Sequence, residues 1–394
     1  MPPLAIHTSR ALTPLAEIPE ALILIEDGAI RSIGPRTAAV LPPSVEEFDA
    51  RDLIAVPGFV DVHVHGAAGC DLMEASPQAL ATVAGCLARH GTTSFLATTV
   101  SAGIQETQRS LEGLAGSIRG QSGNPRGPEI AGAAECLGIH LEGPFLNPVR
   151  RGVHPAQQLI PPSPATLACF LTAAQGFARI LTLAPELPGA EETITAARDA
   201  GLVVAMGHTD ATYAAAMRAI ELGARHAVHV FNAMRPFSHR ETGVLGAVLT
   251  DAGVTAEVIA DGVHVDDPAL CLLLAAKSAE SILLVSDGTA ATGMPDGKYH
   301  LGSVEVTVSA GVCRNQEGKI AGSTLTLDRA VRRMVSLGIP LNAAVQMATW
   351  NPARLLGIEQ RKGRLMPGAD ADIVLLDDSL QVVRVFARGR TSDG

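Results

Sequence analysis

Short apolar runs recur through the middle of the chain and alternate with stretches of helical spacing. The runs are rich in Val, Ile and Leu, and most of the stretches between them are rich in Ala and Leu. Runs that are apolar on both faces and separated by helices are typical of parallel strands with crossovers. Eight runs over roughly 250 residues predict an α/β fold, a (β/α)8 TIM-like barrel, with an open doubly wound sheet as the alternative. The runs are GFVDVHVHG, TTSFLATT, CLGIHLEG, ARILTLAP, LVVAMGH, HAVHVFN, TAEVIADG and ILLVSDG.

Both ends of the chain have a different pattern, in which short apolar strands lie between turn residues. Near the N-terminus, ALILIEDGAIRSIGP contains two apolar runs joined by Asp27-Gly28. This dipeptide suits the positive φ angles of a tight hairpin. Near the C-terminus, GRLMPGADADIVLLD and LQVVRVFARGR are again strand-like. We therefore predict that residues 1–57 and 358–394 form a small β-sandwich domain and that residues 58–357 form the barrel.

The first of these runs carries polar residues at alternate positions. In GFVDVHVHGAAG, residues 58–69, these are Asp61, His63 and His65. Alternate residues of a strand point to the same face, so the three side chains should converge. One interpretation is an edge strand with solvated histidines. The other is that all three face the barrel interior and help to build a metal cage at its mouth.

Polar residues at the ends of the other runs favour the metal cage. Barrels of this kind carry their chemistry where the strands end, at the C-terminal rim. A lone histidine in a strand is typical of core packing, and a lone Asp before Gly is typical of a turn. Here, however, half of the twelve histidines lie at or just beyond predicted strand ends, together with two carboxylates. These residues are His63, His65, His154, His208, His229, His264, Glu142 and Asp287.

The ligand types narrow the choice of metal. Imidazole with carboxylate suits Zn, Fe, Co or Mn, whereas Mg and Ca prefer oxygen ligands alone. Because thiolates are missing from this set, a catalytic site with an open position for water is favoured over a closed structural zinc site.

Composition and charge restrict the partners and the compartment. The net charge of −10 argues against nucleic acid and against an anionic membrane surface. It leaves room for an anionic small substrate, because a metal ion or a few arginines reverse the potential locally. The six cysteines are scattered, which favours a reduced intracellular protein. With no secretory signal or long apolar run in the sequence, we expect a cytoplasmic protein.

Several of these motifs resemble a known family. The HxH of the first run, the later strand-end histidines and the Asp of the eighth run resemble the amidohydrolase superfamily. Within it, HLEGPFLNPVRRGVH, MGHT, HVFNAM, IADGVHV, LVSDG and IAGSTLTL resemble the N-acetylglucosamine-6-phosphate deacetylases over nearly the whole chain. The resemblance implies a homodimer that hydrolyses the acetamide of N-acetyl-D-glucosamine 6-phosphate to D-glucosamine 6-phosphate and acetate. It also implies one or two divalent ions per subunit, zinc first among the candidates.

The resemblance assigns roles to the metal-binding and catalytic residues. Glu142, His208 and His229 would bind one ion. His63 and His65, with Glu142 as a bridge and Asp287 nearby, would bind a second, whose occupancy the sequence leaves open. Asp287 would act as general base and then general acid. His154 would donate a hydrogen bond to the acetyl carbonyl.

The resemblance also assigns the substrate contacts. Arg240 matches the family's phosphate-binding arginine, which can reach across a dimer interface; Arg235 and His239 are nearby alternatives. The backbone amides of Asn232 and Ala233 would add donors, and His264 would contact the sugar. The remaining substrate-binding positions are Val153, Asp261, Gly262, Val263, Ile320, Ala321 and Gly322.

Three alternative functions are left open. N-acetylgalactosamine 6-phosphate differs from the first substrate at a single hydroxyl, which the sequence does not discriminate. A cyclic amidase or deaminase usually has a lysine where this chain has Glu142 and needs no counterpart of Arg240. A catalytically inactive barrel used as a scaffold should have lost some ligands, whereas here the whole set is present.

Overall fold

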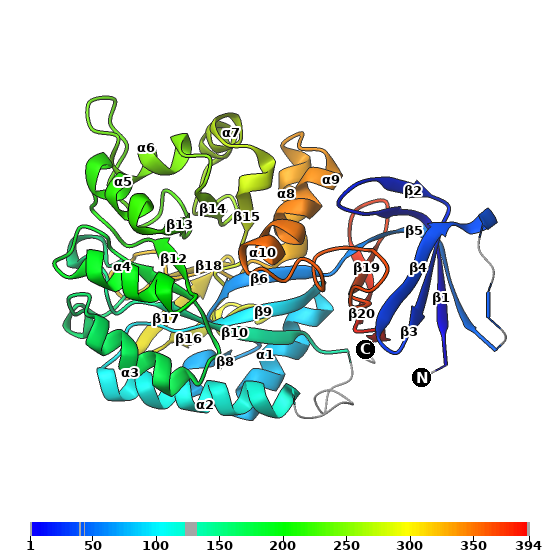
Figure 1. The fold of residues 1–394 in the computed structure, drawn as a ribbon, viewed down its shortest axis with the longest axis horizontal. Coiled ribbons are helices and arrows are strands. Elements are labelled where there is room, and N and C mark those ends of the chain that lie inside the picture. The colour runs from blue at the N-terminus through cyan, green and yellow to red at the C-terminus, as the bar shows by residue number, and fades with distance from the viewer. Residues whose placement is uncertain (1, 39–40, 43, 123–131, 392–394) are drawn as a thin grey trace.

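The computed structural model describes residues 2–38, 41–42, 44–122 and 132–391 (Figure 1). A barrel surrounded by helices lies beside a smaller all-β domain, and the long strand β5 leads from one into the other (Figure 1). Strands from near both ends of the chain lie together in the smaller domain (Figure 1). The fold class predicted from the sequence is therefore confirmed. The predicted bounds of the two domains stay a prediction.

Eight parallel strands form the barrel, and each pairs with its neighbours in chain order. A parallel bridge between Val64 and Gly288 joins the first strand to the segment that follows the last. The Asp287 amide also donates to the His63 carbonyl at 2.9 Å, so the sheet closes on itself. The strands are β6 (Phe59–Val64), β9 (Thr92–Thr98), β10 (Glu135–Glu142), β11 (Ala178–Leu183), β12 (Val203–Met206), β13 (Ala224–Ala227), β14 (Thr255–Val258) and β15 (Ile282–Leu284).

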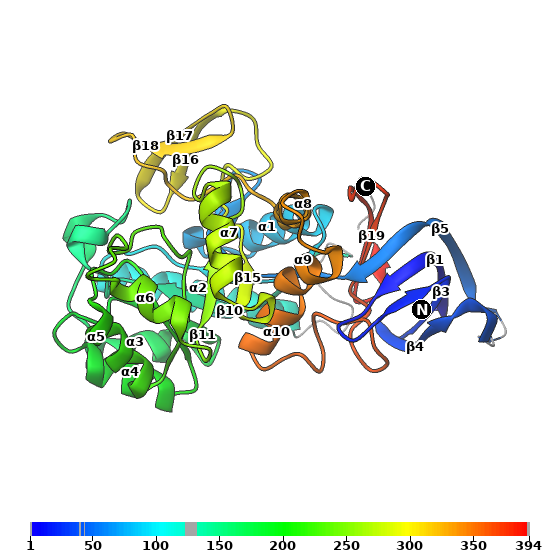
Figure 2. The same ribbon diagram turned by 90° about the horizontal axis from the view of Figure 1, so that it is seen from above.

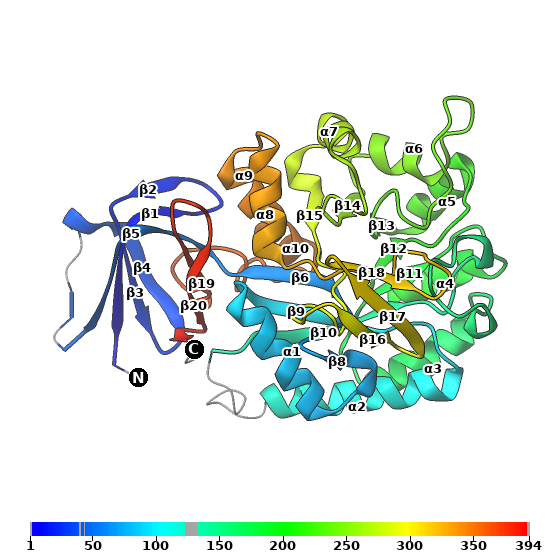
Figure 3. The same cartoon turned by 180° about the vertical axis from the view of Figure 1, so that it is seen from behind.

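Helices cover the outside of the barrel (Figures 1 and 3). Their buried apolar residues belong to the same hydrophobic core as those of the strands. In α8, for example, Leu327, Val331 and Met334 recur at helical spacing and are buried. The helices of the described chain are α1 (Pro77–Arg89), α2 (Ile104–Ser122), α3 (Pro164–Ala174), α4 (Ala190–Asp199), α5 (Tyr213–Leu222), α6 (Gly243–Thr250), α7 (Asp267–Ala276), α8 (Leu327–Ser336), α9 (Leu341–Ala348) and α10 (Trp350–Leu355). None of them has the length and apolar character needed to cross a bilayer.

The smaller domain is one continuous eight-stranded sheet that encloses its own apolar core. Antiparallel pairing of β19 with β5 joins the two ends of the chain, as the sequence predicted. The predicted hairpin is also confirmed, with φ of 51° at Asp27 and 81° at Gly28. The strands are β1 (Leu4–Leu12), β2 (Glu17–Pro19), β3 (Ala21–Glu26), β4 (Ala29–Pro35), β5 (Glu46–Pro57), β19 (Ile373–Leu376), β20 (Val382–Ala387) and β21 (Arg390–Thr391).

A small antiparallel sheet between β15 and α8 was not predicted. It consists of β16 (Gly297–Leu301), β17 (Val304–Ser309) and β18 (Val312–Asn315), and it stands apart from the barrel strands (Figure 2). The Asp71 carboxylate accepts the Gly302 amide at 2.7 Å and so ties this sheet to the segment after β6. That segment forms a two-stranded antiparallel sheet of β7 (Gly66–Ala67) and β8 (Cys70–Asp71).

A buried lysine connects the two domains. Lys362 is 1% exposed, and its Nζ lies 2.8 Å from a carboxylate oxygen of each of Glu135, Asp370 and Asp372. Glu135 begins the barrel strand β10, and Asp372 directly precedes β19 of the smaller domain. A buried ammonium needs such partners, because an unpaired charge in the interior is strongly destabilising.

Glu135→Gln is expected to lower stability in a pH-dependent way. Burial opposes ionisation of Glu135, but Lys362 and Arg361 lower its pKa from 4.5 to about 2. A lowered pKa stabilises the folded state fully above pH 4.5, and this contribution is lost as the pH falls toward 2. We expect a loss of ~3 kcal/mol at most in the free energy of unfolding at pH 7. Urea unfolding from neutral to acid pH tests this; a loss that does not shrink with acidification contradicts it.

Candidate active site

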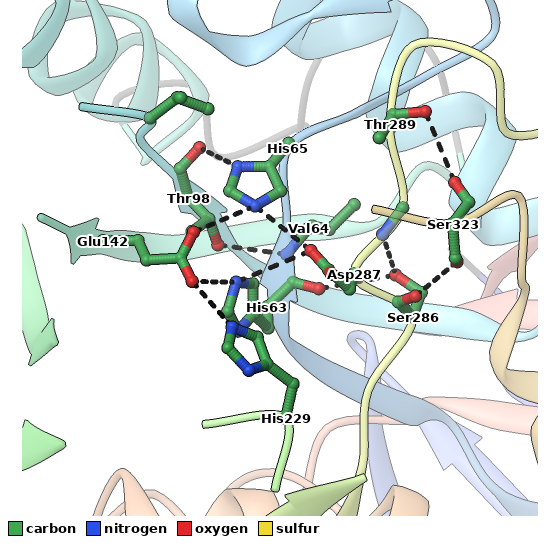
Figure 4. Close-up of polar contacts among 12 residues, drawn as sticks. His63, Val64, His65, Thr98, Glu142, His229, Ser286, Asp287, Thr289 and Ser323 are labelled. Atoms are coloured by element: carbon green, nitrogen blue, oxygen red, sulfur yellow. Dashed lines mark hydrogen bonds and ion pairs between the residues drawn. The ribbon is translucent and has the colours of Figure 1, made fainter. Parts of the chain in front are cut away.

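Five histidine rings converge on the carboxylate of Glu142, the last residue of β10. Figure 4 shows three of them, His63, His65 and His229. The Nε2 atoms of His63, His208 and His229 lie 3.3, 3.1 and 3.0 Å from its Oε1. The Nε2 atoms of His65 and His154 both lie 3.4 Å from its Oε2. All six side chains are buried. A single carboxylate therefore lies at the centre of a cluster built from four barrel strands and the loop after β10.

The backbone turns sharply where these side chains leave the barrel. β12 ends at Met206 and β13 at Ala227, and in each case a histidine follows two residues later. The φ angles of His208, His229 and Asp287 are 47°, 27° and 49°, in the left-handed region that residues other than glycine rarely adopt. Such conformations cluster at functional sites, where the surrounding structure holds them in place. Here they bring three side chains over the barrel mouth.

Hydrogen bonds to the outer ring nitrogens fix the tautomers of three histidines. The Nδ1 of His65 donates to the Thr98 carbonyl at 3.2 Å, and that of His208 donates to the Arg150 carbonyl at 3.1 Å. The Nδ1 of His63 donates to the Glu257 carboxylate at 2.9 Å. Because Nδ1 carries the hydrogen in each neutral ring, Nε2 presents a lone pair to the cluster.

These lone pairs make the cluster suited to a cation. Each faces a carboxylate oxygen of Glu142, so electron pairs oppose one another across about three ångströms. The Nε2 of His63 is buried without a hydrogen-bond partner among the described residues. Imidazole rings held through Nδ1 by a carbonyl or carboxylate are the usual arrangement of histidine metal ligands. The donor set therefore fits a divalent metal ion.

The geometry leaves room for one ion or for two. His208 Nε2 and His229 Nε2 lie 3.2 Å apart, both beside Glu142 Oε1. On the other side of the cluster, Asp287 Oδ1 lies 3.2 Å from His65 Nε2 and 3.7 Å from His63 Nε2 (Figure 4). The structure thus brings together all six residues predicted as metal ligands. Their role as ligands stays a prediction.

His154 differs from the other rings in its tautomer. The Ser101 amide donates to its Nδ1 at 3.2 Å, and the Ser101 hydroxyl lies 2.8 Å from the same nitrogen. Since Nδ1 accepts a hydrogen bond, the hydrogen of the neutral ring is on Nε2, which points into the cluster. His154 is therefore placed as a donor. Ser101 is a supporting residue that the sequence analysis missed.

The two carboxylates of the cluster are ionised. Burial raises the pKa of Glu142, but the neighbouring His63 and the hydrogen bond from His154 bring it well below its usual range. Burial likewise opposes ionisation of Asp287, and the adjacent rings of His65 and His63 lower its pKa. An ionised Asp287 can accept a proton.

A cavity of about 140 Å³ opens above the cluster. Most of its lining was predicted as metal-binding or substrate-binding, and Gly152 and Leu301 are additions that the sequence analysis missed. Leu301 belongs to β16, so the unpredicted small sheet contributes to the wall. The lining residues are His65, Glu142, Gly152, Val153, His154, His208, His229, Asn232, Ala233, His264, Asp287, Leu301, Ile320 and Gly322.

Asp261 lies outside the cavity lining and orients His264, which belongs to it. Its Oδ2 accepts a hydrogen bond from His264 Nδ1 at 2.7 Å, and its Oδ1 accepts the amides of Val263 and His264. The side chain that reaches the cavity is that of His264, which Asp261 orients. Gly262, Val263 and Ala321, also predicted as substrate-binding, lie outside the lining.

Within one chain, only some of the residues predicted to bind phosphate lie at the cavity. Arg240 lies in an exposed loop outside the cavity lining. Its alternative Arg235 is engaged with Asp210, to which it donates through Nε and Nη2 at 2.7 and 2.9 Å. The Asn232 amide donates to the His229 carbonyl at 3.0 Å, and its use as a donor to phosphate stays a prediction.

Below the cluster lies a second layer of buried polar residues. The prediction that Asp61 belongs to the metal cage is wrong: its Oδ1 accepts the amides of His63 and Ser286, deeper in the barrel. Burial raises the pKa of Asp61 to about 7. His140, His226 and Glu257 also belong to this layer and were missed. A charged or imidazole residue inside an apolar barrel strand was the signal that could have identified them.

The chain is similar to known proteins over nearly its whole length. Residues 54–391 match the model of the amidohydrolase family. An N-acetylgalactosamine-6-phosphate deacetylase of Escherichia coli O157:H7 is 38% identical over 386 residues, 98% of each chain. An N-acetylglucosamine-6-phosphate deacetylase of Bacillus subtilis (strain 168) is 36% identical over 93% of this chain and 91% of its own. The solved structure of a Mycobacterium smegmatis N-acetyl-D-glucosamine-6-phosphate deacetylase mutant in complex with N-acetyl-D-glucosamine 6-phosphate covers both chains fully, at 35% identity and a TM-score of 0.91.

Proposed function

This chain belongs to the amidohydrolase family, and we propose that it hydrolyses the acetamide of N-acetyl-D-glucosamine 6-phosphate to D-glucosamine 6-phosphate and acetate. The observation that carries the proposal is the set of imidazole lone pairs that converge on Glu142, with Asp287 and the donor His154 at its edge. The names of the Bacillus and Mycobacterium relatives supply the substrate.

We propose that zinc is the metal, with Fe, Co and Mn as alternatives. Glu142, His208 and His229 would hold one ion, and His63, His65 and Asp287 a second. When bound, the metal would lower the pKa of a water molecule and polarise the acyl carbonyl.

Asp287 would move the proton in this reaction. As an ionised carboxylate it takes a proton from the water that attacks the acetyl carbon. It then gives this proton to the sugar nitrogen as the carbon–nitrogen bond breaks. The attacking oxygen remains on the acetyl carbon, acetate leaves, and the sugar retains a free amine. His65 Nε2 lies 3.2 Å from Asp287 Oδ1, so both groups would contact the same ion.

His154 would stabilise the negative charge that develops on the acyl oxygen. Its Nε2 hydrogen points into the cavity because Ser101 occupies Nδ1. One such donor contributes roughly 3 to 4 kcal/mol to transition-state stabilisation in other hydrolases. On the opposite side of the cavity, His264 would contact the sugar in the orientation set by Asp261.

We further propose that the protein acts as a cytoplasmic homodimer in which Arg240 binds the phosphate of a substrate in the partner subunit. The support is that Arg240 lies in an exposed loop and outside the cavity of its own chain. A guanidinium group suits phosphate through paired hydrogen bonds. The six thiols of the chain are free, as a reducing compartment would require.

Arg240→Ala is expected to raise KM for the phosphorylated sugar by about 10- to 100-fold, since one charge-assisted hydrogen-bonding group is lost. kcat should change little, because Arg240 does not touch the reacting atoms. Steady-state kinetics on N-acetylglucosamine with and without the 6-phosphate separate these effects. An unchanged preference for the phosphorylated sugar would count against phosphate binding by Arg240.

N-acetylgalactosamine 6-phosphate is the second candidate substrate. The Escherichia coli relative that carries this substrate in its name is 38% identical over 98% of this chain. The two sugars share the acetamide and the phosphate, so the metal cluster, Asp287 and His154 would act on both in the same way. Only the contacts to one hydroxyl would separate them.

A parallel assay tests the proposed function. The enzyme is stripped with a chelator, reloaded with one metal at a time and offered both 6-phosphates, both free sugars, a dihydropyrimidine and adenine. We expect no activity without metal, the highest activity with zinc, and acetate release from N-acetylglucosamine 6-phosphate at the highest kcat/KM. A higher value for the galactosamine compound would favour the second candidate. Turnover of the ring amides alone, or of nothing, would overturn the proposal.

A further inference from the structure

Glu257 is a fully buried carboxylate within the barrel strand β14. Its neighbours on the strand, Ala256 and Val258, are apolar and equally buried. A buried charge is retained in a protein interior only where it is well paired and hydrogen-bonded. The partners of Glu257 therefore indicate what the residue does.

Those partners are three hydrogen-bonding groups near the cluster of histidines around Glu142. Glu257 Oε2 accepts a hydrogen bond from His63 Nδ1 at 2.9 Å and a second from the His229 amide at 3.2 Å. Its other oxygen, Oε1, lies 2.8 Å from His226 Nε2. His226 is anchored in turn by the Thr255 hydroxyl, 2.7 Å from its Nδ1.

Glu257 is not a further metal ligand, although His63, His140 and Glu257 lie close enough together to hold an ion. The nitrogen of His63 that faces Glu257 already donates a hydrogen bond to it. Both nitrogens of His140 are engaged, with the Val62 carbonyl at 3.1 Å and the Thr182 hydroxyl at 2.7 Å. The group is therefore a hydrogen-bonded layer beneath the metal cluster.

We propose that Glu257 is a positioning residue that aligns both halves of the metal centre from a single carboxylate oxygen. This inference rests on the proposed function, because it presupposes that the cluster binds metal. The hydrogen bond to His63 turns the ring so that Nε2 faces Glu142 and Asp287. The hydrogen bond to the His229 amide holds the backbone in its left-handed turn, which brings the His229 ring beside His208.

The shared oxygen has a consequence for metal binding. His63 belongs to one predicted ion site and His229 to the other, so loss of Glu257 loosens a ligand of each. Outer partners of metal-binding histidines typically contribute 10- to 100-fold to metal affinity. Weaker binding at both sites is thus the expected signature, whereas a ligand of one ion alone would affect only its own site.

The test uses Glu257→Gln and Glu257→Leu in the full-length protein. Leucine has a similar size and removes both acceptor oxygens, and glutamine retains one. Glu135→Gln is the matched control, because it makes the same change in a barrel strand at the end away from the cluster. Zn²⁺ affinity is measured by competition with a chelator, and the ligand geometry by the visible absorption of the Co²⁺-loaded protein.

We expect Glu257→Leu to weaken Zn²⁺ binding by about 10- to 100-fold and to alter the Co²⁺ spectrum. Glu257→Gln should lie between this variant and the wild type, and the control should match the wild type. The shift in Tm between chelated and Zn²⁺-loaded protein, measured within each variant, removes differences in intrinsic stability. If Glu257→Leu does not fold, Glu257→Gln decides by the same criteria.

Wild-type affinity and an unchanged Co²⁺ spectrum in a folded Glu257 variant would overturn the positioning role. Failure of the wild-type protein to bind any divalent ion would instead overturn the proposed function. The two failures are therefore distinguished by the wild-type titration alone.

Discussion

Asp287→Asn is expected to slow acetate release from N-acetylglucosamine 6-phosphate by about 10²- to 10⁴-fold, the usual contribution of a general acid–base group. Asparagine has nearly the same shape and keeps an oxygen in place of the Oδ1 that lies 3.2 Å from His65 Nε2, but it cannot accept a proton. The loss should therefore fall on kcat and persist in excess metal, while KM and the metal held by Glu142, His208 and His229 change little. Steady-state kinetics together with elemental analysis of the dialysed protein measure both.

Asp61→Asn is the matched control for this experiment. Asp61 is another buried aspartate of the barrel, but it lies below the cluster and accepts the backbone amides of His63 and Ser286. Because burial raises its pKa to about 7, a neutral amide resembles a form that this residue already adopts near neutral pH. The control should keep most of the activity. Near-normal turnover in Asp287→Asn, or an equal loss in both variants, would refute the role of Asp287 in proton transfer.

Glu142→Gln is expected to have the second large effect, by removing the charge on which the cluster converges. The Nε2 atoms of four imidazole rings lie around this carboxylate, and a neutral amide does not offset the charge of a cation between them. We expect metal affinity to fall by 100-fold or more, beyond the ~10- to 100-fold typical of outer partners. kcat/KM should fall by at least about 10³-fold at limiting metal and recover partly in excess metal.

Elemental analysis after dialysis and activity as a function of added Zn²⁺ measure this effect. Glu257→Gln provides the comparison, because it makes the same change one layer deeper and should be milder. Full metal content and wild-type kcat/KM in Glu142→Gln would remove the basis for the proposed site. Loss of activity with full metal content would give Glu142 a role in the reaction other than holding metal.

The sequence by itself determined the fold and the membership of the cluster. Buried parallel strands are mostly apolar along their length, so polar residues at the ends of several such runs indicate a shared place at the rim. This is why His63, His65, Glu142, His208 and His229 could be assigned to one site before any contact was known. The hairpin at Asp27-Gly28 could also be predicted from the sequence, because it depends on the backbone preference of two adjacent residues.

Only the tertiary structure decided what each of these groups can do. The side chains of Asp61 and His63 share one face of β6. Only the contact from Ser286, just after β15, shows that Asp61 lies deeper, and only the contact from β14 shows that His63 is held by Glu257. Because the Ser101 amide donates to His154 Nδ1, the Nε2 of His154 is a hydrogen-bond donor. Because His65 Nδ1 donates to the Thr98 carbonyl, the Nε2 of His65 has a lone pair that can bind a metal ion. The sequence pattern indicates which face of a strand a residue occupies. The tautomer of a histidine, in contrast, depends on hydrogen-bond partners that lie far away along the chain.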